Sequence, residues 1–149
     1  MKHVSILFRS KCWNVFLLLC IALPSLAQKE FKIDQVSVVN VGDGRFLYRD
    51  LMTEKPLNGE HRIIDGYHSA YILASFKDGF YDGKYEEHLD NILINEGVYK
   101  DGRKNGLFKI YSKFDGKLKE EKSYKEGKLN GTSKTFFTDG KIESEKNYR

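Results

Sequence analysis

Two nearly identical phrases, YKDGRKNG (Tyr99–Gly106) and YKEGKLNG (Tyr124–Gly131), lie 25 residues apart in a chain of 149 residues. Two related phrases precede them, MTEKPLNG (52–59) and FKDGFYDG (76–83). The glycines that close the four phrases are separated by 24, 23 and 25 residues; they are Gly59, Gly83, Gly106 and Gly131. A fixed period of this length indicates a repeat architecture, in which each repeat is one supersecondary unit.

A second turn signal lies midway through each repeat and recurs after 25, 25 and 24 residues: Asp65-Gly66, Asp90-Asn91, Asp115-Gly116 and Asp139-Gly140. Such pairs supply the positive φ angles that tight hairpin turns require. The segments between the turns, such as FKIYSKF (108–114), are rich in aromatic and β-branched residues, which favour strands. The sequence therefore predicts an all-β fold, an elongated antiparallel sheet of stacked β-hairpins. The predicted turn glycines are Gly59, Gly83, Gly106, Gly116, Gly131 and Gly140.

Successive residues of a strand point to opposite faces of a sheet. Counting three and five residues past the closing glycines of the third and fourth phrases places four bulky side chains on one face: Lys109, Tyr111, Lys134 and Phe136. Lysines beside aromatic rings can bind an anionic surface or a protein partner. This face is the predicted binding face.

The segment 28–51 precedes the repeats and lacks the phrase. It is predicted to form a hairpin through Gly42-Asp43-Gly44 that caps the first repeat, with the repeats covering 52–149.

The first 27 residues have the features of a signal peptide. Lys2, Arg9 and Lys11 form a basic head, the segment 15–23 is apolar, and Pro24-Ser25-Leu26-Ala27 offers small residues for cleavage after Ala27. The sequence thus predicts an exported protein, periplasmic or at the cell surface. The alternatives are a retained anchor, for which the apolar run is short, and a lipoprotein modified at Cys20.

Removing this segment changes the composition. The chain has 25 basic and 21 acidic residues, and three of the basic ones lie in the first 27 residues. Residues 28–149 therefore carry 22 basic and 21 acidic side chains. This balance does not indicate a nucleic-acid partner. Cys12 and Cys20 are also removed, so the remaining chain is predicted to form no disulfide and no thiolate metal site.

The remaining charge is unevenly distributed along the chain. Residues 99–149 carry 14 basic and 8 acidic side chains, whereas residues 28–98 carry 8 and 13. Two interpretations stay open: ordinary strands with cross-strand ion pairs, or a functional anion-binding face built on Lys109 and Lys134.

No catalytic or metal-binding constellation is found in the sequence, and no cofactor is predicted. The spacings of His61, His68 and His88 match no metal motif, and these residues are expected to be exposed on strands. Asp78 and Asp82 are interpreted as turn residues rather than calcium ligands.

The order of the motifs resembles a known family. An aromatic residue, Lys, Asp or Glu and Gly, followed by Asn-Gly, an aromatic strand, Asp-Gly-Lys and a returning strand, is similar to the MORN-repeat variant of proteins grouped as YwqK-type antitoxins. The resemblance covers about residues 47–148. It departs at Pro56, which replaces the first glycine, and at Asp90-Asn91. It implies a β-hairpin repeat that binds proteins or membranes, without catalytic residues.

These observations support a leading hypothesis, an exported, non-enzymatic module that binds another protein and acts as an antitoxin or immunity protein would. The alternative is a binder of anionic lipid or glycan at the cell envelope. A small hydrolase is the third hypothesis, and no nucleophile–base pair supports it.

Overall fold

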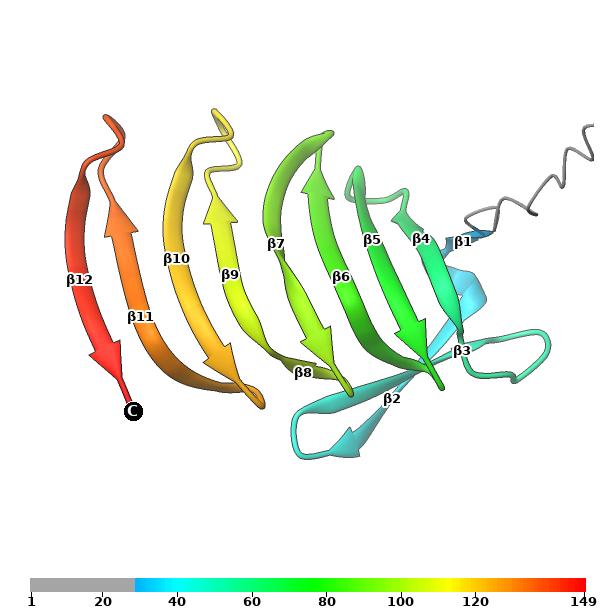
Figure 1. The fold of residues 1–149 in the computed structure, drawn as a ribbon. Helices are drawn as coiled ribbons and strands as arrows, with labels where there is room; N and C mark the ends of the chain where they lie inside the picture. Colours follow the sequence, from blue (N-terminus) through cyan, green and yellow to red (C-terminus); the bar gives the residue numbers. More distant parts are fainter. Residues whose placement is uncertain (1–28) are drawn as a thin grey trace, which may run out of the picture.

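The computed structural model describes residues 29–149, and the predicted signal peptide lies outside them. The predicted fold class is confirmed: these residues form a large, mostly antiparallel sheet and a second, two-stranded sheet (Figure 1). Within the described part, the one short helical turn is η1 (Ile33–Gln35), and no helix there is long and apolar enough to cross a membrane.

The main sheet has ten strands, and all but β8 follow the order β1-β4-β5-β6-β7-β9-β10-β11-β12. Their bounds are β1 (Lys29–Lys32), β4 (Gly59–Asp65), β5 (Ala70–Lys77), β6 (Phe80–Leu89), β7 (Ile92–Lys100), β8 (Arg103–Lys104), β9 (Gly106–Tyr111), β10 (Leu118–Lys125), β11 (Lys128–Phe136) and β12 (Ile142–Tyr148). From β4 onward each strand pairs antiparallel with the next, except that β7 pairs with both β8 and β9. The hairpins therefore stack in chain order, as their local turns require.

The opening segment divides into two parts. β1 covers the edge of the main sheet by pairing in parallel with β4, with Phe31 beside Ile63. The hairpin predicted through Gly42–Gly44 is formed by β2 (Val36–Gly42) and β3 (Arg45–Asp50). This β2–β3 hairpin does not extend the main sheet. It runs across the ends of the strands, where the amide of Tyr48 donates to the carbonyl of Gly79 at 2.8 Å (Figure 1).

The repeated phrase forms the junction between successive hairpins. In the third phrase, Asp101 and Gly102 have φ angles of 55° and 75°, as in a two-residue type I′ turn. The turn glycines donate to a carbonyl of the preceding phrase at 2.8–2.9 Å, in the pairs Gly79 to Leu57, Gly102 to Tyr81, and Gly127 to Lys104. Each copy of the phrase thus binds the next copy, which explains why the sequence repeats.

Four of the predicted turn glycines lie elsewhere than predicted. Gly59 and Gly106 begin strands β4 and β9, and Gly83 and Gly131 lie inside β6 and β11, with φ angles of 116° and 96° for the last two. The pairing register shifts opposite both, because a glycine at positive φ accommodates a β-bulge there. The junction turns therefore lie at Gly79, Gly102 and Gly127, four residues before the closing glycines.

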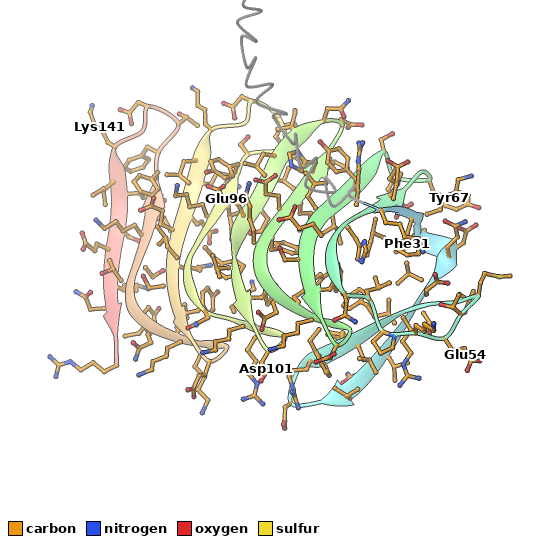
Figure 2. All side chains as sticks on the ribbon, turned by 45° about the vertical axis from the view of Figure 1, so that its right-hand side comes forward. Phe31, Glu54, Tyr67, Glu96, Asp101 and Lys141 are labelled. Carbon is orange, nitrogen blue, oxygen red and sulfur yellow. The ribbon has the colours of Figure 1, made fainter. Side chains whose placement is uncertain are left out.

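The turns at the opposite end of the hairpins are more varied. Asp90 and Asn91 form a two-residue turn, with φ angles of 50° and 63°. Gly116 and Gly140 lie in turns, as predicted, with φ angles of 68° and 84°. In the 65–69 loop the positive φ belongs to Ser69 rather than to the predicted Asp65-Gly66 pair. Figure 2 places Tyr67 and Lys141 at this end of the strands and Asp101 at the junction end.

The core is a row of side chains on one face of the main sheet, here called the aromatic face. Ring centroids lie 4.7–5.8 Å apart along the row, which runs through Phe31, His61, Phe76, Tyr48, Tyr81, Tyr85, Tyr99, Phe108 and Tyr124. Such tilted and edge-to-face contacts stabilise a sheet beyond the burial of area. Ile63 and Phe108 are 2% and 1% exposed. The β2–β3 hairpin contributes Tyr48 to this row.

Candidate functional site

The predicted binding face is the opposite one, here called the ion-pair face. Lys109 and Lys134 lie in one cross-strand row, because both are in register with Glu121 of β10. The same row contains Glu96 on β7 and Glu145 on β12. The prediction that the two lysines share a face is therefore confirmed, and glutamates alternate with them.

Both lysines are paired with these glutamates. The Lys109 ammonium lies 3.3 Å from Glu96 and the Lys134 ammonium 3.8 Å from Glu145. Tyr111 donates its hydroxyl to Glu96 at 2.6 Å. Burial, together with this carboxylate, raises the pKa of Tyr111 to about 12. Partly exposed ion pairs contribute little to stability, but they offset the positive charge that a free anion-binding face would present.

Phe136 is the last residue of β11, two residues past Lys134, and it lies at the same end of the sheet as Tyr111, the last residue of β9. It lines a shallow hollow of about 400 Å³ together with Leu118, Phe137 and Lys117. Leu118 of this hollow is in register with Tyr111 on the neighbouring strand β9. Of the four predicted residues, Phe136 is the one that lines this hollow, whereas Tyr111 and the two lysines contact glutamates.

The aromatic face holds a different lysine. Lys104 on β8 is partly buried, with its ammonium 4.7 Å from the ring centroid of Phe108 and 5.2 Å from that of Tyr124. Burial lowers the pKa of Lys104, and the nearby Lys122 lowers it further, against a weaker raising effect of Glu87. Among the described residues, no carboxylate lies within ion-pair distance of Lys104.

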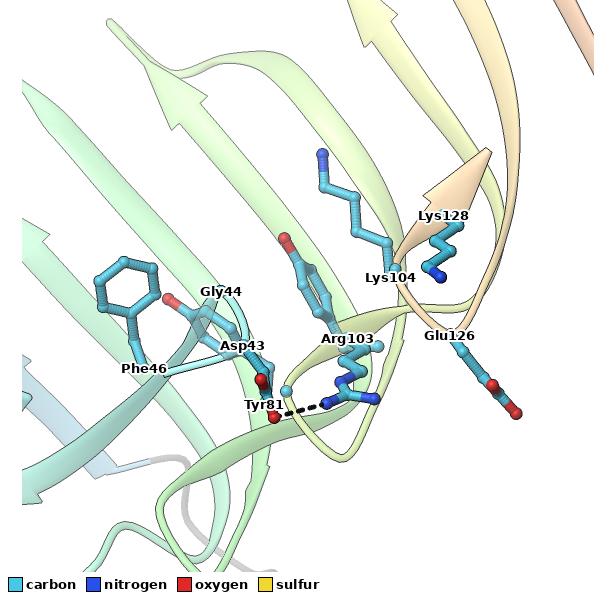
Figure 3. Close-up of a pocket in the computed structure, with 11 residues that line it drawn as sticks. Asp43, Gly44, Phe46, Tyr81, Arg103, Lys104, Glu126 and Lys128 are labelled. Carbon is cyan, nitrogen blue, oxygen red and sulfur yellow. Dashed lines mark hydrogen bonds and ion pairs between the residues drawn. The ribbon is translucent and has the colours of Figure 1, made fainter. Parts of the chain in front are cut away.

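A groove of about 610 Å³ leads to this lysine, between the turn of the β2–β3 hairpin and two junctions of the main sheet (Figure 3). It is here called the tip groove. Its lining combines aromatic and charged groups: Asp43, Gly44, Phe46, Tyr81, Tyr99, Gly102, Arg103, Lys104, Glu126, Gly127 and Lys128. Arg103 is held at the hairpin turn by Asp43, with an Nη2–Oδ2 distance of 3.3 Å.

The hairpin positions the groove because it covers the aromatic row only in part. Its strand β3 places Tyr48 on Phe76 and Tyr81, at centroid distances of 5.4 Å and 4.7 Å. Its turn, at Asp43 and Gly44, reaches the junction between β7 and β8. Beyond this turn the row continues through Tyr99, Phe108 and Tyr124 without a second layer of strands.

Lys104 is not among the predicted binding residues, although the repeat contains a signal for it. The residue two positions before each closing glycine is Leu57, Tyr81, Lys104 or Leu129. Leu57 and Tyr81 are buried in the core, at 3% and 9% exposure. A lysine at a repeat position that otherwise holds bulky apolar or aromatic residues is an anomaly that aligned phrases reveal.

The histidines differ from the prediction that they are exposed on strands. His61 is buried between Phe31 and Phe76, and burial lowers its pKa, so it is a neutral core residue at neutral pH. His88 stacks on Tyr71 at a centroid distance of 4.4 Å. His68 is exposed, as predicted, but lies in a loop beside Asp65 at 2.7 Å.

The acidic residues of the second repeat are structural. Asp78 lies in a junction turn, with a φ angle of 51°. Asp82 accepts a hydrogen bond from the amide of Asp101 at 3.1 Å, across a junction. Within residues 29–149, no group of three or more His, Cys, Asp or Glu side chains could hold a metal ion.

No protein-family model and no curated protein matches this chain. Two solved structures of TarM are similar in part. An S. aureus TarM mutant in complex with fondaparinux, alpha-GlcNAc-glycerol and UDP shows a TM-score of 0.41 and 14% identity, over 72% of this chain and 21% of that chain. A further TarM crystal structure shows a TM-score of 0.40 and 14% identity, over 72% of this chain and 20% of that chain. This chain thus spans about a fifth of the TarM chains, and a likeness of this size says nothing about activity.

Proposed function

We propose that this chain is a non-enzymatic β-repeat interaction module that binds another protein. The observation that supports this most is the aromatic row, which extends past the covering β2–β3 hairpin and lines an open groove with Tyr81 and Tyr99. Aromatic residues in concave, partly desolvated settings are those that dominate binding energy at protein interfaces. A groove of this kind on a rigid sheet is suited to recognition.

The resemblance to the YwqK-type repeat and the predicted signal peptide refine the proposal. An exported antitoxin would neutralise a toxin in the periplasm or at the cell surface, as an immunity protein does. Fractionation of cells that produce the full chain tests this refinement. Recovery of the protein in the cytosol with Met1 to Ala27 intact would contradict it, and the binding module would remain to be tested separately.

The alternative, binding of anionic lipid or glycan by the lysines of the ion-pair face, has less support. Lys109 and Lys134 are each within 4 Å of a glutamate, so a large part of their charge is compensated. An open aromatic groove fits a polypeptide better than a headgroup layer because it can take side chains one at a time.

Affinity capture tests the proposal directly. The full chain, tagged at its C-terminus, is recovered from producing cells and used to capture proteins from envelope extract, at low and at moderate salt. A single protein retained in stoichiometric amount at moderate salt is the expected result, because an aromatic-centred interface resists screening. Retention of lipid or wall material alone, lost on addition of salt, would contradict the proposal and favour the envelope alternative.

A further inference from the structure

The tip groove has the charge and shape to select one class of partner segment. We infer that it binds an acidic, extended segment of the protein partner, with one carboxylate of that segment on Lys104. This inference rests on the proposed function, because it specifies what the module would recognise. It assigns the binding role to the aromatic face and to the hairpin turn, and not to the predicted lysines of the ion-pair face.

Lys104 is the residue that would hold the carboxylate because, within residues 29–149, its ammonium has no acidic partner. The side chain is partly buried against Phe108 and Tyr124, and the described residues place no carboxylate within 4 Å of its ammonium. An incoming carboxylate would meet an ammonium that has already lost part of its hydration. The attraction between this carboxylate and the Lys104 ammonium is therefore stronger than that between a carboxylate and an exposed lysine.

The groups around Lys104 reinforce this preference. Lys128 lines the same groove and is in no ion pair among the described residues. Glu126 and Asp43 also line the groove, so three cationic residues (Arg103, Lys104 and Lys128) lie there with two acidic ones. An adjoining hollow of about 320 Å³ adds Lys125 and Arg149. The groove also lies mostly in the half of the chain with 14 basic and 8 acidic residues, so the long-range field steers an acidic segment toward it.

Two features favour a polypeptide over a polyphosphate or a sulfated glycan. Arg103 is already paired with Asp43, so a uniformly anionic chain would meet no free cation at that point of the groove, whereas a peptide can place a neutral residue there. Tyr81 and Tyr99 line the groove, and Phe46 is 45% exposed beside them. These rings offer apolar contact to side chains between the carboxylates.

A defined probe tests the inference. The full chain is titrated, by fluorescence anisotropy, with a labelled peptide of about ten residues in which glutamate and tyrosine alternate. The test variant is Lys104→Leu, which places at 104 the residue type that the repeat has at 57 and 129. The expected result is a loss of affinity of about tenfold or more, because a partly buried charge pair is removed. The melting temperature of this variant should not fall.

The matched control is Lys134→Leu, the same change on the ion-pair face. Its affinity for the peptide should stay within about twofold of the unchanged chain, since net charge alone contributes little at moderate salt. Equal losses in the two variants would overturn the inference, because binding would then be non-specific attraction. Unchanged affinity in Lys104→Leu, or equal binding of a peptide with glutamine in place of glutamate, would also overturn it.

Two further outcomes separate this inference from the proposed function. Tighter binding of inorganic polyphosphate than of the acidic peptide would overturn the assignment of a polypeptide to the groove. If a captured protein partner binds the unchanged chain and Lys104→Leu equally, the groove is not its binding site, while the proposal of an interaction module stands. If no protein is captured, the module fails, and the peptide titration still decides whether the groove binds acidic chains.

Discussion

Phe108 on β9 packs directly on the backbone of Gly97 on β7. A Cβ atom placed on Gly97 would come within 2.6 Å of the Phe108 ring. The ring is 1% exposed, although none of the strands formed by residues 29–149 lies over it as a second layer. Its burial depends on this close approach to a neighbouring strand, together with the rings of Tyr99 and Tyr124 on either side.

Gly97→Ala should therefore destabilise the fold. The added methyl group must displace a ring that is held on both sides, and overpacking of this kind costs about 1–3 kcal/mol. Urea unfolding followed by circular dichroism measures the change. Gly66→Ala is the control, because nothing lies within 4 Å of its added Cβ and its φ angle is not in the positive region. An equal loss in both variants would contradict the account of Phe108.

The junctions should be weakened by removing one side chain that connects consecutive phrases. Asn58 Oδ1 accepts a hydrogen bond from the amide of Asp78 at 2.8 Å, so Asn58→Ala leaves that amide without its partner. The expected loss of unfolding free energy is about 1 kcal/mol. Asn130 is the equivalent residue of the last phrase, and no amide of the described residues is bonded to its side chain. Asn130→Ala should change the unfolding free energy by less, and the reverse order would contradict the role of the junctions.

Alkaline pH should unfold this protein through its tyrosines. Burial raises the pKa of Tyr48, Tyr81, Tyr85 and Tyr99 above the usual 10, for Tyr99 to about 12. A raised native pKa stabilises the fold fully below pH 10, and this contribution is lost as the pH rises from 10 toward the native value. Each such group adds up to ~1.4 kcal/mol per pH unit to the loss of stability.

Thermal melts at several pH values between neutral and strongly alkaline check this prediction. Stability should stay nearly level to about pH 9 and fall steeply beyond pH 10, where unfolded tyrosines ionise. Tyr99→Phe should make the fall shallower. Tyr67→Phe is the control, because the Tyr67 ring is 88% exposed. A fall of unchanged steepness in Tyr99→Phe would contradict the account.

On the ion-pair face, Glu96 should control the acidity of Tyr111. Glu96→Gln removes the charge beside the phenol, so the pKa of Tyr111 should fall from about 12 toward its ordinary value, while burial keeps it somewhat raised. Nuclear magnetic resonance of the tyrosine ring carbons follows this titration residue by residue. Glu143→Gln, on the exposed edge strand β12, is the control and should leave Tyr111 unchanged. An unmoved pKa in Glu96→Gln would show that burial alone raises it.

The repeat made most of the main sheet predictable from the sequence. Two interleaved turn signals of one period specify hairpins in chain order, and the structure has them. The repeat also places the junctions within the phrases, but it predicts Gly83 and Gly131 as turn residues. They lie in bulges, where the sequence signal of a glycine is the same as in a turn.

The location of the candidate site was less predictable. The alternation of side chains along a strand correctly predicts that Lys109 and Lys134 share one face of the sheet. It does not predict which of the two faces another element covers. That depends on the β2–β3 hairpin, whose contact with the main sheet joins residues far apart in sequence, as from Asp43 to Arg103. His61 was expected on the surface for the same reason, because its burial depends on Phe31 from the opening strand.

The length of the β2–β3 hairpin determines which of the stacked repeats its turn reaches. The amide of Tyr48 donates a hydrogen bond to the carbonyl of Gly79 at one end of the hairpin, and Asp43 in its turn pairs with Arg103 at the other. The distance between these two contacts decides which repeat lines the groove. If the groove binds a partner as proposed, its specificity depends on the order of the repeats counted from the contact of Tyr48 with Gly79 and not on their number. Exchanging two repeats would place different side chains in the groove while the order of hairpins stays the same. The proposed binding specificity can therefore change without a change of fold.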